Sequence, residues 1–70
     1  MGLLTRYPCL RQVIVNCKTA TVFRGVLWRR RGGYLVLRNA SLLRPKAAPV
    51  PMDGEVVIER ANVDFVQVLG

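Results

Sequence analysis

The chain has 70 residues, an apolar content of 51% and a formal net charge of +7, which together limit it to one small basic domain. It has no histidine and only two cysteines, Cys9 and Cys17, fewer than the roughly four nitrogen or sulfur ligands of a structural zinc site, so we expect no metal and no cofactor. It also lacks a phosphate-binding glycine loop, a nucleophile elbow and an acid–base pair, so we expect no enzyme activity.

The beginning of the chain predicts a short lead-in over residues 1–11, followed by a strand. Pro8 argues against a long helix but fits the first turn of a short one that ends at Arg11. We expect the apolar side chains of this lead-in to cover one open end of a barrel. Over residues 12–17, alternating β-branched residues indicate the first strand.

A hairpin is predicted next. The second strand is expected from Thr21 to about residue 30, and the third over residues 34–38, with a turn at residues 31–33. Gly25, inside the second strand, marks a bend or a close approach of two backbones.

The second half of the chain predicts a loop and two further strands. Residues 41–54 hold three of the four prolines and end in an Asp53-Gly54 turn, which indicates a loop. Residues 55–59 form the expected fourth strand, residues 60–62 a short break, and residues 63–69 the fifth strand. Five short strands predict an all-β fold in which the whole chain, residues 1–70, forms one small barrel. Apolar sheet edges would then be covered by neighbouring copies.

Charge is divided unevenly along the chain. Residues 1–52 hold ten Lys or Arg and no acid, whereas residues 53–70 hold one arginine and all four acids. A basic surface attracts nucleic acid or another polyanion through counterion release. The same asymmetry would let the basic part of one subunit face the acidic part of the next, and the sequence leaves both explanations open.

The sequence predicts a cytoplasmic protein, or part of a particle assembled inside a cell, without membrane contact. The first residues lack the apolar stretch of a signal peptide, and no uncharged apolar run approaches the ~20 residues of a membrane span. Arg6 stands where a myristoylation motif has Ser or Thr. We interpret Cys9 and Cys17 as small buried apolar residues of a reducing compartment, in preference to a disulfide pair.

Two stretches carry a family pattern. In residues 12–40, alternating hydrophobics and a short turn precede Phe23, Gly25 and Leu27, and a hydrophobic strand then closes on Ala40. This stretch resembles the first motif of the Sm and Sm-like (LSm) proteins, and more distantly that of the bacterial Hfq proteins. Residues 55–70 are similar to the second motif, since residues 58–63 have its length and hydrophobics follow at Phe65 and Val66.

The resemblance implies a strongly bent, five-stranded Sm-like or SH3-like barrel that forms rings. In such rings the fourth strand of one subunit pairs with the fifth strand of the next, and single-stranded RNA binds at the inner face. On this basis the oligomer interface is expected at Val56, Ile58, Val63, Phe65 and Val66.

The chain also departs from the family pattern. Residues 29–34 lack the Asp and Asn that hold the base in RNA-binding members, and Tyr34 falls near the Asn position. Glu59 stands where the family has a base-stacking arginine, and Arg60 replaces a glycine. Separately, residues 23–28 and 62–65 resemble short basic proteins of actinobacterial bacteriophages, which implies a phage origin.

The densest positive cluster is the predicted nucleic-acid site. Arginines beside aromatic rings suit single-stranded nucleic acid, because the charges follow the phosphates and the rings stack on bases. For the remaining basic residues, Lys18, Arg24, Arg38, Arg44 and Lys46, a role in solubility is favoured, although Arg24 and Arg38 are expected to be outward neighbours across the hairpin. The predicted site consists of Trp28, Arg29, Arg30, Arg31, Tyr34 and Arg60.

Two functional hypotheses follow. The first is a non-enzymatic, ring-forming Sm-like barrel that binds single-stranded nucleic acid, RNA in preference to DNA, by electrostatic attraction. The second is a structural assembly protein, such as a bacteriophage virion or accessory component, whose basic region meets virion proteins or another acidic partner. Glu59 and the missing loop Asn favour the second hypothesis.

Overall fold

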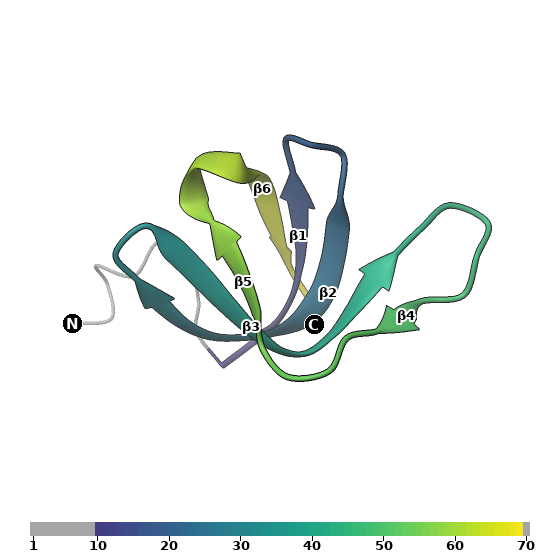
Figure 1. Cartoon of the computed structure of the whole chain (residues 1–70), viewed down its shortest axis with the longest axis horizontal. Coiled ribbons are helices and arrows are strands. Elements are labelled where there is room, and N and C mark those ends of the chain that lie inside the picture. Colours follow the sequence, from purple (N-terminus) through teal and green to yellow (C-terminus); the bar gives the residue numbers. More distant parts are fainter. Residues whose placement is uncertain (1–9, 70) are drawn as a thin grey trace.

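The computed structural model describes residues 10–69, which form one antiparallel sheet of six strands (Figure 1). Strand pairing follows the order β4-β3-β2-β1-β6, and β5 pairs with β3 outside this path. The prediction of an all-β fold is therefore confirmed. The elements are β1 (Gln12–Cys17), β2 (Val22–Arg31), β3 (Tyr34–Leu43), β4 (Val50–Pro51), β5 (Val56–Glu59), the 3-10 turn η2 (Arg60–Asn62) and β6 (Val63–Val68).

The described residues do not close into the expected barrel. β5 pairs with the first half of β3 and β6 pairs with β1, but no pairing joins β5 to β6. The sheet therefore keeps one open edge at β5 and another at β6. Part of the predicted loop also forms strand, because β3 continues to Leu43 and pairs with the short β4. Pro51 is tolerated in β4 because this strand lies at the edge of the sheet.

Two irregularities bend the long hairpin of β2 and β3. At the first, β3 has one extra residue opposite Gly25, and Asn39 there adopts a positive φ of 51°. A Cβ on Gly25 would lie only 3.0 Å from the backbone oxygen of Arg38, so the predicted close backbone approach is confirmed. At the second, Trp28 is an extra residue in β2. Both are β-bulges, which add bend and twist to the strands, and Figure 1 shows the curved hairpin.

The core lies on the concave side of this bent sheet. Alternate residues of each long strand point inward, and the largest fully buried side chains include Leu27, Leu35 and Leu37. Burying one such side chain contributes roughly 1.5–3 kcal/mol relative to leaving it exposed. The buried cluster is Val13, Val15, Cys17, Leu27, Leu35, Leu37, Ala40 and Ile58, with Phe23, Val56, Val63 and Val66 packed against it.

Cys17 is free and buried, as predicted for a small apolar residue, and desolvation raises the pKa of its thiol. Cys9 and most of the predicted lead-in, including Pro8, lie outside the described residues. The main chain of Leu10 and Arg11 continues the pairing of β1 with β2 through hydrogen bonds to Leu27. Among the described residues, no helix has the length and apolar character needed to cross a membrane.

Candidate nucleic-acid interface

The tip of the β2–β3 hairpin presents a tyrosine and an arginine side by side. Gly32 supplies the positive φ of 51° in the turn, and the flanking residues Arg31 and Tyr34 are direct cross-strand partners. Both are exposed, and Tyr34 keeps 46% of its surface in contact with solvent. A guanidinium and an aromatic ring are therefore available together at one end of the molecule.

The turn η2 brings a distant segment to the same tip. The backbone N–H of Arg60 donates a 2.7 Å hydrogen bond to the carbonyl oxygen of Gly33. Residues predicted from two separate stretches thus meet, and we call Arg29, Arg30, Arg31, Tyr34 and Arg60 the tip cluster. Glu59 lies opposite Tyr34 in the neighbouring strand, so one carboxylate borders the cluster.

Trp28 lies away from this tip. Trp28 follows the inward-pointing Leu27, so its side chain points to the convex face of the sheet. There the guanidinium of Arg38 stacks 4.0 Å from the centroid of its ring. Arg38 in turn donates a 2.9 Å hydrogen bond to Glu55. The expected cross-strand neighbours Arg24 and Arg38 are not paired, since Arg24 lies opposite Ser41 and Arg38 opposite Val26.

The predicted interface residues differ in exposure. Ile58 is buried, and Val56, Val63 and Val66 are half-buried against the core, so these four side chains stabilise the subunit itself. Phe65 is 52% exposed on β6. Val57 on β5 and Val68 on β6 were not among the predicted residues and are 57% and 43% exposed. Because successive side chains of a strand point to opposite faces, Val57 lies on the face opposite to Ile58.

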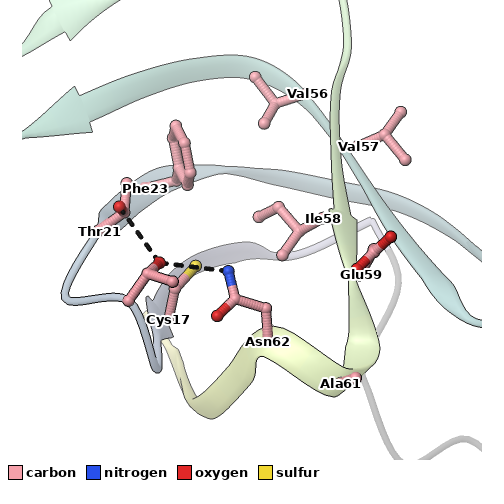
Figure 2. A pocket seen from close by; sticks show the side chains of 10 residues that line it. Cys17, Thr21, Phe23, Val56, Val57, Ile58, Glu59, Ala61 and Asn62 are labelled. Atoms are coloured by element: carbon pink, nitrogen blue, oxygen red, sulfur yellow. Dashed lines mark hydrogen bonds between the residues drawn. The ribbon is translucent and has the colours of Figure 1, made fainter.

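A groove of about 600 Å³ lies beside the open edge of β5 (Figure 2). Its apolar wall includes Phe23, Val56 and Ile58, and polar side chains line the opposite part. There the amide of Asn62 donates to the Thr19 hydroxyl at 3.3 Å, and the Thr19 hydroxyl donates to that of Thr21 at 3.4 Å. No sequence signal links Asn62 to Thr19, because 43 residues separate them.

The side chains at the tip supply positive charge and an aromatic ring. Within residues 10–69, no three His, Cys, Asp or Glu side chains gather in a way that could hold a metal ion. The exposed arginines at the tip supply fixed positive charge, and Tyr34 supplies a stacking face. Such a set suits a polyanion that carries aromatic groups.

Comparisons with known families and curated proteins do not assign a function to the chain. No model of a known protein family matches the chain. No curated protein matches it either. The function must therefore be argued from the geometry of the tip and of the sheet edges.

Proposed function

We propose that this protein is a non-enzymatic module of the Sm-like type that associates with its own copies and binds single-stranded RNA through the tip cluster. The observation that carries the proposal is the meeting of the β2–β3 tip with η2, through the hydrogen bond from Arg60 to Gly33. This contact brings Arg60, the one arginine of residues 53–70, to the arginine-rich hairpin beside an exposed tyrosine.

Charge and stacking favour a single strand as the ligand. Arginine contacts phosphate oxygens in a bidentate manner and also stacks on planar groups. Base stacking on an aromatic ring does not depend on a given sequence, because every base has a flat face. Binding is therefore expected to be weakly selective and strongly dependent on salt.

The test compares two triple variants of equal charge. Arg29→Ala, Arg30→Ala and Arg31→Ala together remove the hairpin charges, whereas Lys18→Ala, Arg44→Ala and Lys46→Ala remove three charges from positions away from the tip. Binding of fluorescein-labelled oligouridylate is measured by anisotropy at increasing salt. We expect the hairpin triple variant to lose at least ~10-fold in affinity and the control to change much less. Equal losses of affinity in both variants would contradict a specific role of the tip cluster, because they would indicate a general effect of net charge.

A structural assembly role is the second candidate, and the two open edges favour it. Within residues 10–69, β5 and β6 each pair on one side only. Both carry exposed apolar side chains, Val57 on β5 and Phe65 and Val68 on β6. Pairing of β5 with β6 of a second copy would satisfy both edges. Because the two surfaces differ, this contact would repeat from copy to copy and give a ring where the rotation between copies closes, or a filament where it does not.

Light scattering with and without nuclease tests association through the sheet edges, which both candidates include. A large native mass that survives nuclease and falls in Phe65→Arg indicates assembly through the edges. A mass that drops on nuclease treatment of the wild-type protein indicates that nucleic acid holds the copies together. A monomer in both conditions would contradict the association part of the proposal.

A further inference from the structure

The convex face of the sheet carries arginines well beyond the tip. Arg24, Arg29 and Arg31 are exposed on β2, and Arg38 is half-buried on β3. Leu27 and Leu37 are paired across the hairpin and fully buried, so their side chains point inward. The register places the four arginines on the opposite, convex face. We call Arg24, Trp28, Arg29, Arg31 and Arg38 the convex track.

The bulge at Trp28 makes this track continuous. Without it, strand alternation would send Trp28 and Arg29 to opposite faces of the sheet. With the extra residue, Arg29 pairs with Val36 on the convex side, and Trp28 also points there, against Arg38. Two consecutive side chains, one aromatic and one cationic, therefore lie next to each other in the middle of the row.

Trp28 and Arg38 are in contact at the centre of the track. The guanidinium of Arg38 lies 4.0 Å from the centroid of the indole. Its Nε is 2.9 Å from the Glu55 carboxylate, and the side chains of this ion pair are 42% and 44% exposed. An incoming phosphate can therefore compete with Glu55 for Arg38 in contact with solvent.

We propose that the RNA strand does not end at the tip cluster but continues along the convex track, with phosphates on Arg31, Arg29, Arg38 and Arg24 and a base against Trp28. This inference rests on the proposed function and extends its site over the length of β2. From Arg24 to Arg31 the strand advances about seven residues, or roughly 23 Å. Such a length suits a single strand of several nucleotides, within the ~4–16 nucleotides of known single-strand binding domains.

The chain's single tryptophan lies in this track, so it reports directly on occupancy. In the test, oligouridylates of about 4 and about 12 nucleotides are added to the full-length protein, and both RNA anisotropy and Trp28 emission are followed. We expect the longer RNA to quench Trp28 and to bind more tightly than the shorter one. RNA binding with unchanged Trp28 emission at both lengths would overturn the track and leave the tip proposal standing.

Variants then test the charges. Arg24→Gln with Arg38→Gln should lower the slope of log affinity against log salt by about 1.4, which is ~0.7 for each phosphate that the variant no longer neutralises. Glu55→Gln should instead tighten binding about threefold, because it removes a competing carboxylate from Arg38. A gain of this kind cannot arise from misfolding, so Glu55→Gln keeps the inference testable if the double variant is unstable. Unchanged affinity in Glu55→Gln and an unchanged slope in Arg24→Gln alone would refute the inference.

The same titration separates other outcomes. If polyglutamate quenches Trp28 as strongly as RNA of equal charge, the track is a surface for an acidic protein and the inference is wrong. If the wild-type protein binds no RNA at all, the proposed function fails together with its extension.

Discussion

Replacing Gly25 with alanine tests the bend on which the arrangement of the sheet depends. The added Cβ would lie 3.0 Å from the carbonyl oxygen of Arg38 and 3.1 Å from the Cα of Ala40. Both atoms belong to the backbone of the bulged strand, so they cannot rotate away as a side chain would. Overpacking of this kind costs about 1–3 kcal/mol, and the lower chain entropy of unfolded alanine returns about 0.4–1 kcal/mol of that.

The midpoints of these two ranges give an expected net loss of about 1.3 kcal/mol in the free energy of unfolding, measured by urea or thermal denaturation followed by circular dichroism. For a domain of this size, that loss corresponds to a decrease in Tm of ~5–10 °C. Gly33→Ala is the matched control, because a Cβ at Gly33 meets nothing within 4 Å. If Gly25→Ala unfolds at the same temperature as Gly33→Ala, β2 and β3 do not approach each other so closely at the bulge.

Two further predictions concern the core. Leu27 is fully buried, so Leu27→Ala should lower the free energy of unfolding by about 2–5 kcal/mol. Leu10 is 64% exposed, so the control Leu10→Ala should change this free energy by less than about 0.5 kcal/mol. Similar losses for the two variants in denaturant melts would contradict the assignment of Leu27 to the core. Burial raises the pKa of the Cys17 thiol above its ordinary value of 9.0, so the folded chain holds this proton more tightly than the unfolded chain. The resulting stabilisation is complete below about pH 9 and is lost as the pH rises through the raised pKa. Between about pH 8 and pH 10, the wild type should therefore lose more free energy of unfolding than Cys17→Ala. Equal losses in the two proteins would contradict the prediction.

Local pattern was enough to predict most of the strands. The alternation of residues 12–17 and the apolar run of residues 55–59 match β1 and β5 closely, and the predicted break at residues 60–62 is η2. The third strand was predicted to end at Arg38 but continues to Leu43. The reason is the bulge at Asn39 and Ala40, where β3 contains one extra residue and still continues as a strand. In a sequence pattern with a period of two residues, such an extra residue looks like the end of a strand.

The site was predicted less completely, for two physical reasons. The bulge at Trp28 moves the partner of Arg38 from Leu27 to Val26, so simple alternation could not foresee the contact of Trp28 with Arg38. The second bulge restores the register, and Arg24 lies opposite Ser41, three residues from Arg38. The link between Arg60 and Gly33 depends on how β5 returns alongside β3, which no local pattern encodes. Closure of the sheet is likewise a long-range property, because it requires two edges, β5 and β6, to meet.

The two halves of β3 have different neighbours, and this makes the chain suited to the attachment of a tag or a label. Before Asn39 this strand borders β5 and the core, and after Ala40 it borders only β2 and the short β4. The exposed residues 44–49 at the end of this arm contribute no side chain to the buried cluster. A peptide tag or a fluorophore attached there would lie on a peripheral extension, far from the hydrophobic interior, and would leave folding of the rest of the chain intact.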